Sequence, residues 1–240
     1  MSCEDEQLYK YNESDFKHAF LEKSEFTILY PEWRNEYILK NKEPMMELLK
    51  YQKIDCIVKL KERSITISTN ENTRDPYVIL KANDFVRLVC RGVPLKEANE
   101  IFKDDMFCDI IKLDKQGFSK EITEKRKKRL EGDALESLSM LTKCFIVMHK
   151  GTLSCIGPYK GVEEVRSIAL DTIKNIHPVY NLKILMEKRK LEKNPEMKNE
   201  DWDRFLPKIK KINKKSKNPR KKNKENTKNK GKKEEISKEE

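Results

Sequence analysis

Apolar residues in the first seventy positions recur with the periods of short strands and amphipathic helices. An apolar run over 26–30 predicts a strand that Pro31 ends, and helical spacing follows as far as Pro44, where a helix must break or begin anew. Residues 54–60 and 64–69 alternate between apolar and polar positions and predict a hairpin. The predicted order to this point is strand, helix, helix, strand, strand.

A longer helix is predicted next. Asp75 and Pro76 have the character of an N-cap and a first helical residue, and apolar positions then recur at helical spacing until Gly92. Pro94 begins a shorter helix that extends through Phe102. These helices complete a first unit with the order β-α-α-β-β-α.

The same order returns in the second half of the chain. The pattern predicts a strand over 108–113, a basic connection over 120–128 and a helix over 134–142. A hairpin is predicted from 144–148 and 152–156, which are both apolar and separated by a short polar turn.

Helical spacing resumes over 165–176 and again over 178–193. The β-α-α-β-β-α order is thus present twice, and it is the order of a type I KH domain. The sequence therefore predicts an α+β fold of two tandem KH-like domains, followed by a C-terminal helix and a disordered basic tail. We expect five segments: a polar extension at 1–23, a divergent first KH-like domain at 24–104, a second KH domain at 105–177, a helix with a Trp-containing strap at 178–208, and a tail at 209–240.

KH modules hold single-stranded nucleic acid with a G-x-x-G loop between their first two helices, where two backbones approach each other closely. No glycine precedes Gly92, so the first unit cannot contain this loop, and we assign it a packing or protein-contact role. In the second unit the loop falls near 129–132. Only Gly132 remains there, and Glu131 stands where an anion would bind.

The five consecutive cations at 125–129 begin just before this degenerate loop and extend into it. They could replace loop geometry with charge and give sequence-tolerant contacts to phosphates, although a solvated helix face would have the same composition. The predicted RNA contacts in the folded body are Lys125, Arg126, Lys127, Lys128, Arg129, Gly132 and Lys160.

The net charge of +11 is concentrated at the C-terminal end. Residues 206–240 hold 15 Lys and Arg against 5 Asp and Glu, and they contain no aromatic residue, so we predict a disordered handle for a polyanion. Residues 214–222 resemble a nuclear import signal. The alternative is a solubilising tail without a specific partner. The predicted RNA contacts of the tail are Lys214, Lys215, Arg220, Lys221 and Lys222.

The sequence offers little for catalysis, metals or membranes. It contains no phosphate-binding loop and no nucleophile elbow, and its apolar runs are too short to span a bilayer. The six cysteines form no C-x-x-C pair, which favours buried free thiols in a reducing compartment. His149 is expected in a hairpin turn and His177 at a helix end, facing its carboxyl terminus. Asp104, Asp105 and Asp109 could hold a hard cation, but a surface turn is favoured.

Several stretches resemble the KRR-type KH-domain assembly factor of the small-subunit processome, the nucleolar particle that builds the small ribosomal subunit in eukaryotes. They are Asp75-Pro76-Tyr77 with Ile79-Leu80-Lys81-Ala82, the run 104–112, Gly157-Pro158-Tyr159-Lys160-Gly161, and the run from Lys174-Asn175-Ile176-His177-Pro178 to Trp202-Asp203-Arg204-Phe205-Leu206-Pro207. The resemblance implies tandem KH domains, pre-rRNA and other processome proteins as partners, a location in the nucleus and nucleolus, and neither catalysis nor a cofactor. The family's usual G-P-x-G loop in the second KH domain is missing here.

Two hypotheses of different classes follow. The first is a non-enzymatic RNA-binding assembly factor whose first unit docks proteins. The second is a protein–protein scaffold in the same particle, whose folded domains make little contact with RNA. Partner contacts are predicted at Trp202, Arg204 and Phe205, either as a strap folded onto the second unit or, as we favour, as an anchor for a neighbour. An enzyme using the acidic cluster has little support.

Overall fold

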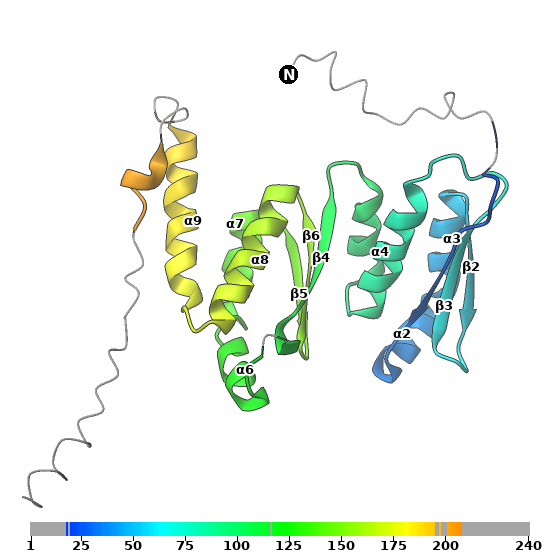
Figure 1. The fold of residues 1–240 in the computed structure, drawn as a ribbon, viewed down its shortest axis with the longest axis horizontal. Coiled ribbons are helices and arrows are strands. Elements are labelled where there is room, and N and C mark those ends of the chain that lie inside the picture. The colour runs from blue at the N-terminus through cyan, green and yellow to red at the C-terminus, as the bar shows by residue number, and fades with distance from the viewer. Residues whose placement is uncertain (1–17, 19, 116, 195–196, 198–200, 208–240) are drawn as a thin grey trace, which may run out of the picture. The chain divides into compact units, whose positions relative to one another are not determined.

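A computed structural model describes residues 18, 20–115, 117–194, 197 and 201–207. Within these residues two α+β domains follow one another along the chain (Figure 1). The predicted basic tail and nearly all of the predicted N-terminal extension lie outside the described residues.

The first domain has the predicted order of elements. Its sheet is antiparallel, in the order β1-β3-β2, and pairs Phe26 with Ile67 and Cys56 with Ile67. The elements are β1 (Glu25–Leu29), η2 (Glu32–Arg34), α2 (Asn35–Lys40), α3 (Lys42–Tyr51), β2 (Ile54–Lys59), β3 (Ser64–Thr69), α4 (Val78–Cys90), α5 (Leu95–Ala98) and η3 (Asn99–Phe102).

The second domain repeats the arrangement, with an antiparallel sheet in the order β4-β6-β5. Two further helices follow its last core helix. The elements are β4 (Phe107–Lys112), η4 (Leu113–Lys115), α6 (Lys120–Lys127), α7 (Asp133–Thr142), β5 (Phe145–His149), β6 (Thr152–Gly157), α8 (Tyr159–Ile173), α9 (Pro178–Lys193) and η6 (Trp202–Arg204). Both domains therefore have the KH order, each with a three-stranded sheet.

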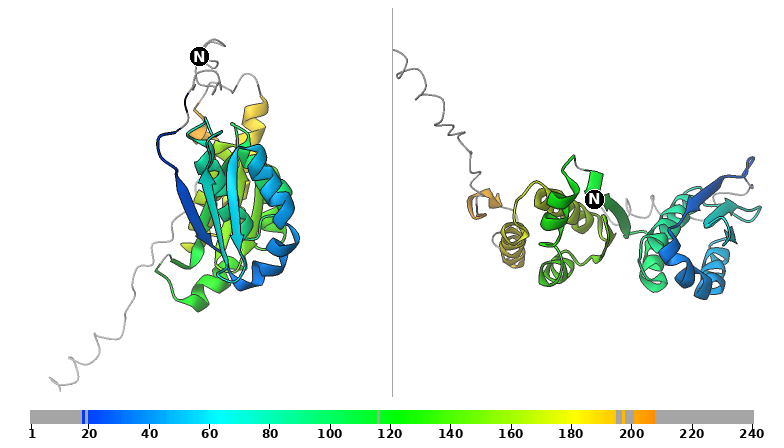
Figure 2. Two further views of the ribbon diagram at one scale, coloured as in Figure 1. Left: turned by 90° about the vertical axis from the view of Figure 1, so that its right-hand side faces the viewer. Right: turned by 90° about the horizontal axis from the view of Figure 1, so that it is seen from below.

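Helix α4 joins the cores of the two domains. It buries eight of its residues, including Phe85, because apolar side chains face both the first sheet and the second. Cys108, Phe145 and Val147 of the second sheet pack against the same core cluster. The other face of that sheet packs on α7 and α8 through residues such as Leu153. The second sheet lies between helices, as Figures 1 and 2 show, whereas no described element covers the outer face of the first.

Three local predictions are wrong, each for a physical reason. The stretch predicted as a basic connection is helix α6. This helix buries only Thr123, so its sequence has no apolar stripe from which a helix could be predicted. Helix α4 begins at Val78, two residues after Pro76, because Asp75 accepts a hydrogen bond from the Tyr77 amide (2.8 Å) and stabilises a turn before the helix. His149 is the last residue of β5 and not part of the turn.

The thiols are free, as expected, in the part of the chain that the structure describes. Cys90, Cys144 and Cys155 are buried, and Cys56 and Cys108 are half-buried. Burial raises the pKa of Cys90 to about 12, so this thiol is protonated at neutral pH. Among the same residues, no helix combines the length and the apolar character that crossing a membrane requires.

Candidate nucleic-acid interface

The loop between α6 and α7 occupies the position of a KH clamp but is folded inward. Its first amides are used in a tight turn: Arg129 N–H donates to the Arg126 carbonyl (3.1 Å), and Leu130 N–H donates to that of Lys127 (2.8 Å). The Leu130 side chain is buried in the second core. These amides are therefore not available to a phosphate.

Carboxylates surround the remaining glycine of this loop. Gly132 has a φ of 72° and a ψ of −136°, a backbone conformation that side chains disfavour, and α7 begins at the next residue. Asp133 and Glu136 lie in the first turn of α7, where they compensate the positive end of the helix. With the exposed Glu131 they place three carboxylates beside Gly132, and these carboxylates oppose the binding of a phosphate at this helix N-terminus.

Three of the five consecutive cations hold α6 in place. The Arg126 guanidinium donates to the carbonyl of Ile173 at the end of α8 and lies 4.7 Å from the centroid of the Phe118 ring. Arg129 donates to the Asn175 side-chain oxygen (3.1 Å). The Lys127 ammonium donates to a backbone carbonyl in the β5–β6 turn. Their first role is therefore structural.

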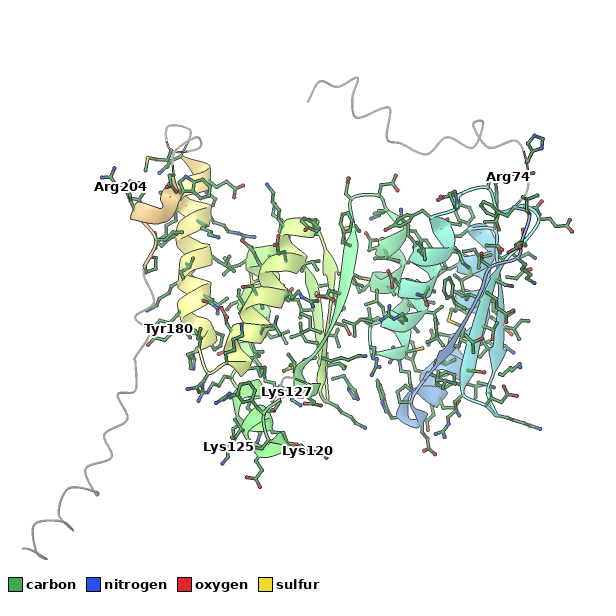
Figure 3. The ribbon with its side chains drawn as sticks, viewed as in Figure 1. Arg74, Lys120, Lys125, Lys127, Tyr180 and Arg204 are labelled. Carbon is green, nitrogen blue, oxygen red and sulfur yellow. The ribbon has the colours of Figure 1, made fainter. Side chains whose placement is uncertain are left out.

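The other two cations, Lys125 and Lys128, are exposed, and their side chains form no hydrogen bond or ion pair with the described residues. Figure 3 shows Lys125 and Lys120 on different sides of α6. Lys120, the first residue of α6, was not predicted as a contact, because this helix was not predicted either. The anchored helix thus presents a small, fixed group of lysines to solvent.

Other predicted contacts do not join this group. Lys160 lies in the first turn of α8, about 20 Å along the helix from Ile173 and its Arg126 contact. The five predicted tail contacts lie outside the described residues. The candidate surface is therefore smaller than the sequence pattern suggested.

The glycines of Gly157-Pro158-Tyr159-Lys160-Gly161 serve packing. A Cβ on Gly161 would lie 2.5 Å from the Thr142 carbonyl oxygen, and one on Gly157 would lie 2.5 Å from the Cys144 sulfur. Both glycines let α8 and β6 approach the junction of α7 and β5. This motif therefore positions the helices of the second domain and is not a second G-x-x-G loop.

Two of the three acidic residues considered for a cation form ion pairs. Asp104 pairs with Lys81 (2.7 Å), and Asp109 pairs with Arg166. No group of three His, Cys, Asp or Glu side chains suited to a metal occurs among the described residues. His177 differs from expectation, because its Nδ1 accepts a hydrogen bond from the Val179 amide (3.4 Å) and caps the start of α9.

The aromatic cluster after α9 is partly described. The Trp202 indole N–H donates to the Met197 carbonyl (2.7 Å), and its ring is half-buried. Arg204 and Phe205 are exposed, and Figure 3 shows Arg204 beside the C-terminal end of α9. The local hydrogen bond fits a strap and the exposed neighbours fit an anchor, so the role of this cluster stays a prediction.

Two protein-family models match the chain in succession. The model described as the Krr1 KH1 domain matches residues 24–104. The model described as the KRR1 small subunit processome component, second KH domain, matches residues 106–193. Together the two matches span more than two thirds of the chain.

Solved structures share the fold at low sequence identity. A crystal structure of a protein of unknown function from Aeropyrum pernix is 16% identical with a TM-score of 0.63, over 73% of this chain and 97% of that one. A chain of the a/eIF2alpha–aDim2p–rRNA complex from Pyrococcus horikoshii OT3 is 18% identical with a TM-score of 0.62, over 71% and 96%. Dim2p from the same organism is 18% identical with a TM-score of 0.59, over 68% and 99%. These similarities show the fold alone.

Proposed function

The chain belongs to the family of the KRR1 small subunit processome component, and on that premise we propose that it is a non-enzymatic assembly factor that binds pre-rRNA. It acts in the nucleolus, together with other processome proteins, in pre-rRNA processing and small-subunit biogenesis. One of the proteins of similar fold is part of a complex that contains rRNA, which supports RNA as the partner class.

The observation that carries the proposal is that the five consecutive cations at the end of α6 have two different roles. Arg126, Lys127 and Arg129 fix the helix by contacts within the domain, while Lys125 and Lys128 remain exposed. Lysines on a fixed helix can contact successive phosphates without reading bases, because phosphate contacts carry orientation and affinity but no sequence information. RNA binding by this domain is therefore sequence-tolerant, and the Lys-rich tail adds affinity by electrostatics alone.

The rival function is a protein scaffold whose domains make little contact with RNA. The carboxylates of Glu131, Asp133 and Glu136 at the clamp position favour it. The first domain supports it too, because the outer face of its sheet carries Leu29 and Ile57, which are 73% and 56% exposed. We assign protein docking to that domain and partner contact to Trp202, Arg204 and Phe205. RNA binding remains assigned to the second domain.

The test uses the chain truncated after Pro207, which removes the tail, and single-stranded RNA at several salt concentrations. The slope of log affinity against log salt reports the number of phosphate contacts, at about 0.7 per contact for single strands. The double substitution Lys125→Gln, Lys128→Gln should reduce this slope by about 1.4. The matched control is Lys40→Gln, Lys50→Gln, which removes two exposed helical lysines of the first domain and should leave the slope unchanged.

Three results decide between the two functions. A reduced slope in the α6 variant alone supports the RNA-binding surface. Equal slopes in the α6 variant, the control and the unmodified chain refute it. Loss of all measurable RNA binding on truncation favours the scaffold.

A further inference from the structure

An open hollow of about 460 Å³ lies where the two domains meet. We call it the junction hollow. The first domain contributes Pro31, Trp33 and Arg91, and the second contributes the end of β4 and the β5–β6 turn. Its volume is within the range of about 300–1,000 Å³ that small-molecule sites occupy. Neither the family matches nor the predicted contacts assign a role to it.

The charge of the junction hollow favours an anion. Its lining includes the cations Arg91, Lys112 and Lys150 against one carboxylate, that of Asp114. The Asp114 carboxylate lies against the backbone of Gly151, where a Cβ would overlap it. Burial and the neighbouring cation Lys150 lower the pKa of His149, so this ring adds no charge at neutral pH. The balance is therefore positive.

An aromatic ring stands beside these cations in a fixed orientation. The Trp33 indole stacks on the His149 ring with 3.8 Å between ring centroids, and it remains 38% exposed. Its neighbour Arg34 is buried and donates to the carbonyls of Val89 (2.8 Å) and Val93 (2.7 Å), which fixes the backbone at this point. The Lys150 ammonium lies 6.0 Å from the centroid of the indole, so the exposed part of the ring, where a base can stack, has a cation beside it.

We propose that the junction hollow binds one nucleotide of single-stranded RNA, with its base on the exposed part of Trp33 and its phosphate beside Arg91 and Lys150. Aromatic side chains next to cations are how proteins hold unstacked bases, and each stacked base contributes about 1–3 kcal/mol. An acidic peptide could use the cations but would leave the indole without a partner, so RNA fits the lining better. The proposal rests on the proposed RNA-binding function.

The position of the hollow fits one continuous strand of RNA. The Lys127 ammonium bonds the carbonyl of Lys150, so α6 and the rim of the hollow are in direct contact. The exposed lysines lie on other sides of the helix from Lys127, so a strand long enough to pass around the end of α6 can contact both them and the junction hollow. The first domain then takes part in RNA binding through Trp33 and Arg91, although it has no clamp of its own.

The experiment uses fluorescence, because the chain has only two tryptophans. Trp202→Phe leaves Trp33 as the single tryptophan, and a short oligouridylate is added while its own label reports binding by anisotropy. We expect the Trp33 emission to be quenched in step with binding. Arg91→Gln with Lys150→Asn should weaken binding about tenfold and reduce the quenching; Asn suits the left-handed backbone of Lys150, whose φ is 49°. Lys40→Gln with Lys50→Gln is the control.

The outcomes separate this proposal from the function on which it rests. RNA binding without quenching, and without an effect of the Arg91 and Lys150 substitutions, overturns the junction site but leaves the proposed function intact. No RNA binding by any variant overturns both. If oligoglutamate quenches Trp33 and competes with RNA, the occupant of the hollow is an acidic peptide and the proposal is overturned. Competition by inorganic phosphate without quenching supports the proposal.

Discussion

The Trp33 indole of the first domain stacks on the His149 imidazole of the second, with 3.8 Å between the ring centroids. Gly92, with a φ of 109°, lies under the edge of the indole, and a Cβ there would be 3.6 Å from Trp33 Cη2. This contact places the end of strand β5 against the start of the first helical segment. It connects two domains whose elements are about a hundred residues apart in the sequence.

Protonation of His149 is expected to weaken the fold. Burial and the cations Lys150, Arg34 and Lys127 lower the pKa of His149 below its usual value of about 6.5. The unfolded chain therefore takes up this proton first, and the contribution of His149 is present above about pH 6.5 and lost as the pH falls through its lowered folded pKa. Denaturant unfolding near pH 7.5 and near pH 5.5 measures the difference. His149→Phe keeps a ring for stacking and should reduce the loss at low pH.

The control for this prediction is His18→Asn, which changes an exposed histidine and should keep the full loss. An equal loss in the unmodified chain and in His149→Phe would assign the pH dependence to other groups.

Arg34 is expected to contribute strongly to stability. Its side chain is buried, donates to two carbonyls at the end of α4 and lies 3.5 Å from the Tyr37 ring centroid. Arg34→Met removes both hydrogen bonds, although the Val89 carbonyl keeps the bond from the Gly92 amide (3.3 Å), and should lower the free energy of unfolding by about 2–3 kcal/mol. Arg87→Met is the control: its exposed pair with Asp84 (3.4 Å) should be worth less than about 1 kcal/mol. Similar losses in the two variants would show that the carbonyl contacts matter little.

Gly161→Ala is expected to separate α8 from α7. The new Cβ would lie 2.5 Å from a backbone oxygen, that of Thr142, which cannot rotate away. We expect a loss of about 1–3 kcal/mol in the free energy of unfolding, measured by urea denaturation. Ser167→Ala, at an exposed position of the same helix, should be neutral or slightly stabilising. Full stability in Gly161→Ala would mean that the two helices can move apart at no cost.

The carboxylates at the start of α7 are expected to oppose RNA binding. Asp133→Asn with Glu136→Gln should raise the affinity for single-stranded RNA and lower stability by about 0.3–1 kcal/mol for each charge removed from the helix N-terminus. Glu43→Gln with Glu47→Gln in α3 is the control for affinity, since Glu43 also lies in a first helical turn. Unchanged affinity in the α7 variant would show that RNA does not pass this loop.

Trp202→Ala distinguishes the two roles of the C-terminal aromatic cluster. As an anchor, the ring contributes to association, so recovery with processome particles should fall while the melting temperature barely changes. A drop in melting temperature with normal recovery would instead identify a strap that uses its hydrogen bond to Met197 to fold onto the domain.

The element order was predictable because its signals are local. Alternation over 54–60 reflects a strand with one covered face, whereas β3, the central strand, is buried along nearly all of its length. Helix α6 was missed because only Thr123 of its eight residues is buried, so its stability depends on a contact from Arg126 to Ile173, 47 positions away. No local pattern carries such a contact.

The candidate site was predicted only in part, because several of its contacts join residues far apart in the sequence. The place of the degenerate loop followed from the KH order, but the structural use of Arg126, Lys127 and Arg129 depends on long-range partners. The junction hollow was not predictable, because Trp33 and His149 come together only through tertiary packing. One available signal was not used: a continuous apolar run over 144–148 is typical of a strand covered on both faces.

Helix α4 covers one face of the sheet in its own domain. It also covers one face of the second sheet, through contacts with Phe145 and Val147. The two KH domains are therefore one unit of folding, and denaturation should show a single transition for both. A fragment that began at β4 would expose an apolar sheet face to water and tend to aggregate. This dependence gives a physical reason for the chain to keep a first domain without a G-x-x-G loop, because the solubility of the second domain requires it.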